Sequence, residues 1–494
     1  MKELKERTLK GALAKISAQG INLFVRVGSL MVLARLLDPK DFGLVAMVTA
    51  VTGVFALFRD AGLSMVTIQR PTISREEIST LFWLNMLAGT IVAALSVAIA
   101  PLLVTFYHEP RLFWVTVVLA SGFLFNAAGA QHSALLQRNM RFTTISAIDI
   151  VSQTISALVG IALAMSDFEY WAIVASTIVS PAVSTLGVWS VSPWTPGLPR
   201  WGINLGAMIR LGGLATFNSL IMYVAYNLEK VLLGRFWGAE SLGLYGRGYQ
   251  LINIPTDGLN SAGGEVAFSA LARLQSEPLR LRDYFLKGYS AIVALTVPLT
   301  ISCALFANDI ILIILGHKWA EVVPIFRLLI PTMLFFALIN PLAWLLFSIG
   351  MVGKSVRLAM VLAPLVMASY VVGLPYGPTG VAVAYSSVLM LWLIPHIAWC
   401  VHGTVICFRD ILKAASQPFI SGIVAAGCAF AAQFLYGPSL SPFPRLILGG
   451  GVLMAVYLWM LLYVMGKKEF YIDLLRTMKG RASVKEKEAI LGVL

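Results

Sequence analysis

Charged and amide side chains recur at helical spacing inside two very apolar stretches of the chain. In the first stretch, residues 16–36, Gln19, Asn22 and Arg26 follow one another at intervals of three and four residues. These intervals place side chains on one face of a helix. A charge at the centre of a membrane helix costs about 2.5–3.5 kcal/mol to insert, so such residues usually mark a substrate or ion pathway. We therefore expect binding chemistry on this face.

A second apolar stretch, residues 242–268, repeats the pattern. Arg247, Gln250 and Asn253 are three residues apart, and Asp257 follows four residues later. At 1.5 Å per residue, Asp257 lies about 15 Å along the helix from Arg247 and on the same face. A partly buried carboxylate can load and release a proton or a sodium ion. Asp257 is therefore the better-placed candidate for a coupling-ion site, and Asp60 and Asp149 are the alternatives.

The amides on these faces have an alternative role, because polar side chains also pair across buried helix–helix interfaces. For the four amides both roles remain open. Arg26 differs, since residues 16–36 contain no acidic residue that could neutralise it. Glu229 and Lys230 lie near the end of another apolar run, and we expect them to pair with partners near the membrane interface.

The composition of the whole chain indicates a membrane protein. Its 494 residues are 58% hydrophobic and only 12% charged, whereas soluble domains carry about 25% charged residues. The formal net charge is +13, but the basic residues are scattered singly and form no nucleic-acid motif, so no nucleic-acid partner is expected. A better account of the charge is the excess of Lys and Arg in cytoplasmic loops.

Fourteen runs of residues have the length, roughly 20 residues, and the apolar character of membrane-spanning helices. They lie at about residues 16–36, 43–64, 79–105, 113–136, 144–166, 170–192, 211–234, 242–268, 287–315, 322–349, 355–375, 379–401, 417–437 and 445–466. Alternate loops carry two or more Lys or Arg residues, while the loops between them carry few. This asymmetry predicts a multi-pass protein with both termini in the cytoplasm.

Two short hinges between these runs resemble one another. Residues 35–44 read RLLDPKDFGL, and residues 235–244, which lie 200 positions later, read RFWGAESLGL. Six predicted spans separate the hinges, so two six-helix blocks would share the same orientation in the membrane. Two parallel bundles of this kind leave a cavity between them that can open to either side in turn.

The predicted architecture is therefore an all-α polytopic membrane protein of about 14 transmembrane helices, made of two pseudo-symmetric six-helix bundles and two further helices. The predicted boundaries are residues 1–200 for the first bundle, 201–402 for the second, 403–466 for the additional helices and 467–494 for a basic cytoplasmic tail.

Several segments resemble the polysaccharide transporter branch of the multidrug/oligosaccharidyl-lipid/polysaccharide exporter superfamily. Within this branch the chain is most similar to Wzx-type flippases for colanic acid and succinoglycan. The resemblance rests on VLARLLDPKDFGL (32–44), DAGLSMVTIQRPTISREEISTLFWLN (60–85), ALLQRNMRF (134–142), LLGRFWGAESLGLYGRGYQL (232–251) and ILGHKWAEVVPIFRLL (314–329).

The resemblance implies a transporter of the bacterial inner membrane. Such proteins move undecaprenyl-diphosphate-linked sugar repeat units to the periplasmic leaflet, among membrane lipids and alongside a polysaccharide polymerase and co-polymerase. Arg26 and Arg247 suit the diphosphate, because a guanidinium can bind phosphate oxygens bidentately. The amides at 19, 22, 250 and 253 suit the sugar hydroxyls.

Other functions find less support in the sequence. The chain shows no credible Walker A, HExxH or GxSxG motif, no carboxylate cluster and no large predicted periplasmic loop. We therefore expect no enzymatic activity, no catalytic residues, no metal site and no cofactor. The alternative within the superfamily is a cation-coupled exporter of drugs or of another lipid, and a scaffold role in polysaccharide assembly also remains open.

Overall fold

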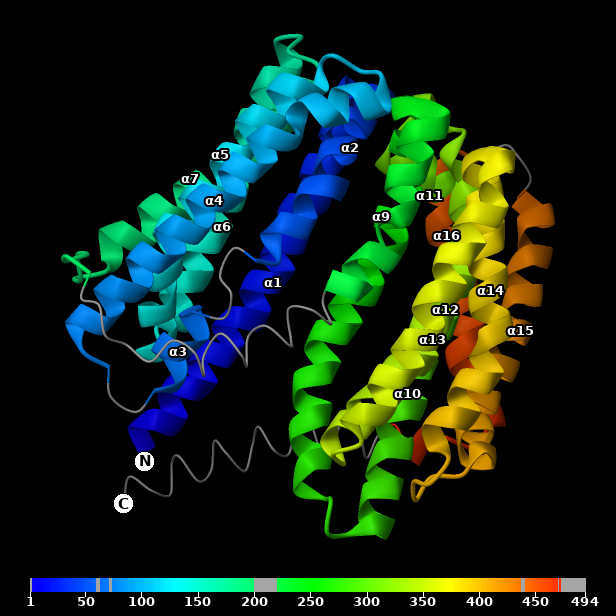
Figure 1. Ribbon diagram of the computed structural model, residues 1–494. Coiled ribbons are helices and arrows are strands. Elements are labelled where there is room, and N and C mark those ends of the chain that lie inside the picture. The colour runs from blue at the N-terminus through cyan, green and yellow to red at the C-terminus, as the bar shows by residue number, and fades with distance from the viewer. Residues whose placement is uncertain are drawn as a thin grey trace. The chain divides into compact units, whose positions relative to one another are not determined.

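The computed structural model of the chain is almost entirely helical (Figure 1). It describes residues 2–58, 63–70, 73–199, 220–436, 440–469 and 471, with side chains from residue 19 onward except those of residues 69, 257–263, 265, 266 and 269. Every regular element within these ranges is a helix. This finding confirms the predicted all-α class.

The helices follow one another through short turns. The first in chain order are α1 (Lys2–Leu36), α2 (Pro39–Ala56), α3 (Leu63–Gln69), α4 (Arg75–Tyr107), α5 (Leu112–Arg138), α6 (Phe142–Met165), α7 (Tyr170–Val191) and α9 (Leu228–Arg273). After them come α10 (Pro278–Leu305), α11 (Ala307–Ile314), η1 (His317–Trp319), α12 (Val322–Ser348), α13 (Val352–Gly373), η2 (Leu374–Tyr376), α14 (Gly377–Val401), α15 (Phe408–Tyr436), α16 (Pro442–Trp459) and η4 (Met460–Val464).

Ten helical segments of the described residues are long and apolar enough to cross a membrane. They confirm a multi-span membrane protein, while the total of fourteen spans remains a prediction. One segment, Val352–Val401, contains both α13 and α14. A Cβ atom on Gly373 would lie 2.4 Å from the carbonyl oxygen of Gly380, although residues seven apart in one helix are about 10 Å apart. The chain therefore reverses at η2, as the separate spans predicted.

The second hinge is present as a break within α9. A turn was expected between the spans at 211–234 and 242–268, and α9 consists of two helices joined at a kink at Gly238, whose φ of +81° and ψ of −178° are not helical. Glycine adopts positive φ without the steric cost of a side chain. The part of the earlier span before residue 220 lies outside the described residues.

The chain forms two compact units. The first comprises Met1–Gly248, Ile314–Ile325 and Ala359–Tyr385, and the second comprises Tyr249–Ile313, Phe326–Leu358 and Ser386–Leu494. The boundaries of the two predicted bundles remain predictions.

Small residues bring the helices of the first unit close together. Helix α1 packs on α6, α4 packs on α5, and α7 packs on both α5 and α6. A Cβ atom on Gly89 of α4 would lie 2.5 Å from the Cβ atom of Ala127, and one on Gly129 of α5 would lie 2.8 Å from the hydroxyl of Thr185. Close backbone approach of this kind is typical of helices packed in a membrane.

Helices α10, α15 and α16 pack against one another in the second unit, and the core there also contains residues of α12, α13 and α14. Helix α10 contributes a buried residue at every fourth position, namely Leu281, Phe285, Tyr289, Val293 and Val297. The hydroxyl of Tyr457 on α16 donates a hydrogen bond to the carbonyl of Ala294 at 2.8 Å. A Cβ atom on Gly422 of α15 would lie 2.5 Å from the side chain of Val297. The last two long helices therefore belong to the same packed unit as α10.

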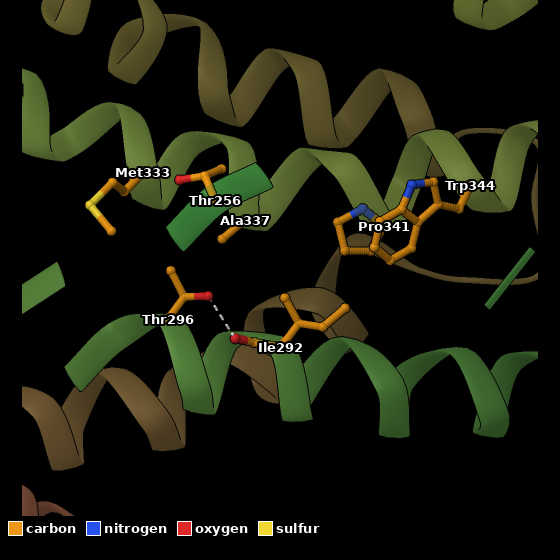
Figure 2. A pocket seen from close by; sticks show the side chains of 7 residues that line it. All are labelled: Thr256, Ile292, Thr296, Met333, Ala337, Pro341 and Trp344. Carbon is orange, nitrogen blue, oxygen red and sulfur yellow. Dashed lines mark hydrogen bonds between the residues drawn. The ribbon is translucent and has the colours of Figure 1, made fainter. Parts of the chain in front are cut away.

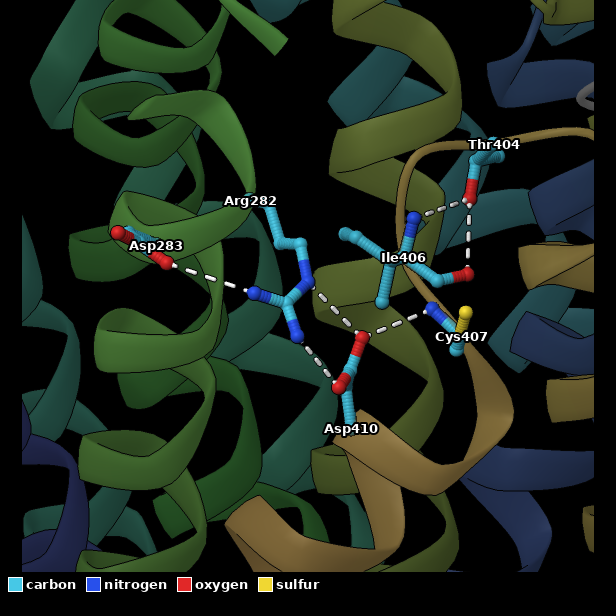
Figure 3. A network of polar contacts seen from close by, with 6 residues as sticks. All are labelled: Arg282, Asp283, Thr404, Ile406, Cys407 and Asp410. Carbon is cyan, nitrogen blue, oxygen red and sulfur yellow. Dashed lines mark hydrogen bonds and ion pairs between the residues drawn. The ribbon is translucent and has the colours of Figure 1, made fainter. Parts of the chain in front are cut away.

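An ion pair joins the starts of α10 and α15 (Figure 3). Arg282 donates two hydrogen bonds to Asp410, at 3.0 and 2.6 Å, and Asp410 also accepts one from the backbone N–H of Cys407 at 3.0 Å. Bidentate geometry of this kind is specific as well as favourable. The contact fixes the first turn of α15 against α10.

We expect Asp410→Asn to lower the thermal unfolding midpoint in detergent by about 2–4 °C, because both the ion pair and the cap of α15 are weakened. The control is Asp283→Asn, since Asp283 lies 3.7 Å from Arg282 but is 70% exposed and should leave the midpoint unchanged. Equal midpoints for the two variants would show that the Asp410 contact contributes nothing measurable.

Candidate functional site

The two hinges lie directly against one another. A Cβ atom added to Gly43 would lie 1.7 Å from the carbonyl oxygen of Ala239, and one added to Gly243 would lie 1.9 Å from that of Pro39. Residues 43 and 243 are equivalent positions of the two hinges, and so are residues 39 and 239, because the members of each pair are 200 residues apart. Each glycine therefore meets the equivalent carbonyl of the other hinge. Reciprocal contacts of this kind define a two-fold relation. We call these four residues the hinge contact.

A loop from later in the chain covers the first hinge. The indole N–H of Trp319 donates a hydrogen bond to the carbonyl of Ala34 at 2.7 Å. Lys318 forms an ion pair with Asp38 at 2.8 Å, and the ring of Phe42 meets Trp319 edge-on with a centroid distance of 5.4 Å. This loop follows the third span of the second predicted bundle.

The second hinge is covered in the corresponding way by the end of α4, the third span of the first predicted bundle. Arg235 lies over the ring of Phe106 at 5.6 Å, and a Cβ atom on Gly234 would lie 2.9 Å from the ring of Tyr107. Each predicted bundle therefore covers the hinge of the other. We call these two sets of contacts, together with the hinge contact, the crossed clasp.

The loop after α4 is held by its own ion pair. Arg111 donates to both carboxylate oxygens of Glu109, at 2.8 and 2.9 Å, and lies over the ring of Tyr170 at 5.7 Å. The hydrogen bonds from Arg111 hold the pKa of Glu109 below its usual value. Glu109 therefore stays ionised and keeps the loop beside Phe106 and Tyr107 in place.

Arg247 on α9 contacts the first hinge. The carbon of its guanidinium is 4.0 Å from the centroid of the Phe42 ring, a close cation–π distance. Phe42 is only 4% exposed. Arg26 on α1 belongs to the same unit as Arg247. The two cations predicted from separate apolar stretches therefore lie in one compact unit.

The three candidate residues of α1 differ in exposure. Gln19 and Arg26 are exposed and Asn22 is half-buried. The buried side-chain carbonyl oxygen of Asn22 has no hydrogen-bond partner within the described part of the chain. A residue that serves only to join helices would be paired. For Asn22 this observation favours the binding role.

The remaining predicted residues lie farther along α9. Gln250 and Asn253 are half-buried and belong to the second unit. The predicted coupling residue, Asp257, has its side chain outside the described residues.

Glu229 is the functional candidate whose environment the sequence did not predict. Its side chain is 1% exposed, and neither carboxylate oxygen has a hydrogen-bond partner among the described residues. Lys230 donates to Asn227 at 2.7 Å. The expected pairing of Glu229 near the interface is therefore not met in the described part of the chain. An isolated buried carboxylate is strongly disfavoured in its charged form, so Glu229 would bind a proton or another cation.

A break in the helix stands next to Glu229. Residues 220–225 are helical, residues 226 and 227 form a turn, and α9 begins at Leu228. Glu229 also lies nine residues before the Gly238 kink, which is about 14 Å along a helix. Interrupted helices beside buried charges are typical of transporter binding sites. The sequence signal was the Glu–Lys pair inside an apolar run.

A recess in the second unit is too small for a cargo (Figure 2). Its lining residues are Thr256, Ile292, Thr296, Met333, Ala337, Pro341 and Trp344. Both threonine hydroxyls donate to carbonyls of their own helices, and the space has room for about one water molecule.

Comparison with known proteins places these features in context. Residues 32–324 match the family model described as polysaccharide biosynthesis protein. The lipopolysaccharide biosynthesis protein WzxC of Escherichia coli (strain K12) is 28% identical over 70% of this chain and 70% of its own length. The teichuronic acid biosynthesis protein TuaB of Bacillus subtilis (strain 168) is 30% identical over 58% of this chain and 60% of its own length.

Among solved structures, the lipid II flippase MurJ in an inward closed conformation shares the fold. It aligns with a TM-score of 0.73 over 95% of this chain and 100% of that chain, at 15% sequence identity. The likeness therefore extends across both units, although at this identity it concerns the fold alone.

Proposed function

Because the chain belongs to the polysaccharide biosynthesis protein family, we propose that it moves an undecaprenyl-diphosphate-linked oligosaccharide from the cytoplasmic to the periplasmic leaflet of a bacterial inner membrane. The relatives named for lipopolysaccharide and teichuronic acid biosynthesis support a role in polysaccharide synthesis. The fold of a lipid II flippase supports a lipid-linked cargo. The polymer is of the exopolysaccharide kind, succinoglycan-like or colanic-acid-like.

The observation that carries the proposal is the placement of Arg247, whose guanidinium lies 4.0 Å over the buried ring of Phe42 in a protein of this family. A diphosphate would be attracted by Arg247 and by Arg26, which belongs to the same unit. Guanidinium groups bind phosphate oxygens bidentately, and Gln19 and Asn22 would exchange hydrogen bonds with the sugars. Gln250 and Asn253 are candidates for the same role within the second unit.

The predicted topology places the hinge end of the helices in the periplasm. In this arrangement the crossed clasp closes the periplasmic end, and the cargo enters from the cytoplasmic leaflet. Opening the clasp while closing the opposite end would release the cargo outward, which is alternating access between two bundles. A polymerase and co-polymerase would then take up the unit.

A cation gradient is the proposed energy source. Asp257 is the coupling candidate from its position on the Arg247 face, and Glu229 is the candidate from its unpartnered burial. The two candidates can be tested separately, because a substitution can neutralise one carboxylate and leave the other unchanged.

We expect Arg26→Ala and Arg247→Ala each to reduce repeat-unit flipping by about 10–100-fold, since each removes a charge-assisted contact with phosphate. The assay is restoration of polymer in a deletion strain that makes an acidic exopolysaccharide, with the leaflet of the diphosphate-linked unit followed at equal protein abundance. Arg280→Ala is the control, because the Arg280 side chain is 76% exposed and forms an ion pair with Glu277.

Three outcomes decide the assignment. Units trapped in the inner leaflet by both variants would support the transporter and the anion site. Normal activity of both variants would make the arginines structural. Units that reach the outer leaflet in the deletion strain itself would contradict the flippase function and favour a drug or other lipid exporter.

A further inference from the structure

Arg247 is linked to the crossed clasp through a series of aromatic contacts. Its guanidinium lies over one face of Phe42 at 4.0 Å, and the edge-on contact of Phe42 with Trp319 has an interplanar angle of 65°. Trp319 is itself fully buried and hydrogen-bonded to Ala34. The contacts therefore connect α9, the first hinge and the loop of residues 317–319, which are three separate segments of one unit.

The stacked geometry suits an arginine that binds an anion. Stacking uses the face of the guanidinium plane, whereas phosphate oxygens bind to N–H groups along its edge. A ring beneath the plane thus fixes the direction of these donors. The electronegative face of the ring also attracts the positive charge of the guanidinium.

We propose that Phe42 is a positioning residue for Arg247, and that the Phe42–Trp319 pair couples diphosphate binding to closure of the crossed clasp. The inference rests on the proposed function, which assigns Arg247 to the diphosphate. Separation of the first hinge from α9 removes the ring beneath Arg247, so the affinity for diphosphate falls when the clasp opens. By reciprocity, bound diphosphate favours the closed clasp.

This coupling makes release depend on the state of the clasp. The cargo binds tightly while the periplasmic end is closed and its anion site is assembled. Opening of the clasp dismantles the same site, so the diphosphate is released on the side that has just opened. Because bound diphosphate itself opposes opening, the energy for opening comes from the proposed cation gradient.

The test uses full-length protein in nanodiscs with undecaprenyl diphosphate as the probe. One measurement is the Kd. The other is the closed fraction of the clasp, reported by a short thiol cross-linker between Asp38→Cys and Lys318→Cys, with the exposed Cys407 and Cys428 changed to serine. The native pair is in contact and both side chains are more than half exposed, so the reagent can reach the site.

We expect Phe42→Leu to weaken diphosphate binding about tenfold and to abolish the increase in cross-linking that diphosphate causes. Phe42→Tyr keeps a ring beneath Arg247 and should retain both properties. The control for general loss of packing is Phe285→Leu, because Phe285 is also 4% exposed but lies in the core of the second unit. It should change neither measurement.

The outcomes separate the inference from the proposed function. If Arg247→Ala abolishes binding while Phe42→Leu binds and cross-links as the wild type does, the positioning role is wrong and the anion site stands. If Phe42→Leu and Phe285→Leu weaken binding equally, the effect is general packing and the inference is again wrong. If the wild-type protein binds no diphosphate, the proposed anion site and the inference both fail.

Discussion

Replacing Gly243 by alanine is expected to stop the two hinges from meeting and to reduce repeat-unit flipping by at least about tenfold. The added methyl group would lie 1.9 Å from the carbonyl oxygen of Pro39, and a backbone atom of this kind cannot turn aside as a flexible side chain can. Gly43→Ala should have the same effect, because its methyl group would lie 1.7 Å from the carbonyl oxygen of Ala239.

Gly246→Ala is the matched control for this prediction. Gly246 lies one turn farther along α9, and a Cβ atom there meets nothing within 4 Å. Gly243→Ala and Gly246→Ala both raise the helix propensity of α9 by about the same amount. A difference in flipping between these two variants therefore reports the effect of the hinge contact alone. The measurements are flipping at equal abundance and cross-linking between positions 38 and 318. Normal flipping by Gly243→Ala would show that the hinges need not meet during transport.

The hinge contact illustrates what the sequence could predict. The repeat of Gly-Leu 200 residues apart predicted equivalent positions in two bundles, and the structure places Gly43 and Gly243 in reciprocal contacts. The reason for the two glycines was not predictable, because each one makes room for a backbone atom of the other hinge. Local patterns carry no information on which distant segment approaches a given residue.

In the candidate binding site, too, the sequence predicted the residues but not their neighbours. Helical spacing was enough to select Arg26, Asn22 and Arg247, since charges and amides are rare in membrane helices. The stacking of Arg247 on Phe42 was beyond sequence reasoning, because Phe42 reads as one more apolar residue in an apolar region. Periodicity identifies the face of a helix but not the neighbour that this face meets.

The sequence drew attention to Glu229, but the predicted environment of its side chain was wrong. A Glu–Lys pair near the predicted end of a span suggested partners at the interface, whereas Lys230 bonds to Asn227 and Glu229 is buried without a described partner. The break at residues 226 and 227 contains neither glycine nor proline. Neither the hydropathy nor a helix-breaking residue therefore predicted the interruption of the helix there.

Glu229→Gln is expected to reduce cation-driven flipping to the level of protein-free vesicles while leaving the protein folded. Glutamine has the shape of the protonated glutamate and carries no charge, so it removes cation loading without creating a cavity. The thermal unfolding midpoint should stay the same or rise, because no charge remains to be buried in that site. The measurement is transport of a labelled lipid-linked oligosaccharide in vesicles, with and without an imposed proton or sodium gradient.

Two further variants decide which carboxylate couples transport to the gradient. Glu240→Gln is the control, because Glu240 is an exposed glutamate on the same helix and should leave gradient-driven flipping unchanged. Asp257→Asn tests the candidate predicted from the sequence. Loss of the gradient response in Asp257→Asn alone would move the coupling site from Glu229 to Asp257. Full gradient-driven flipping by both neutral variants would mean that neither carboxylate loads the coupling ion. The cargo would then have to be drawn across the membrane by its consumption in polymerisation.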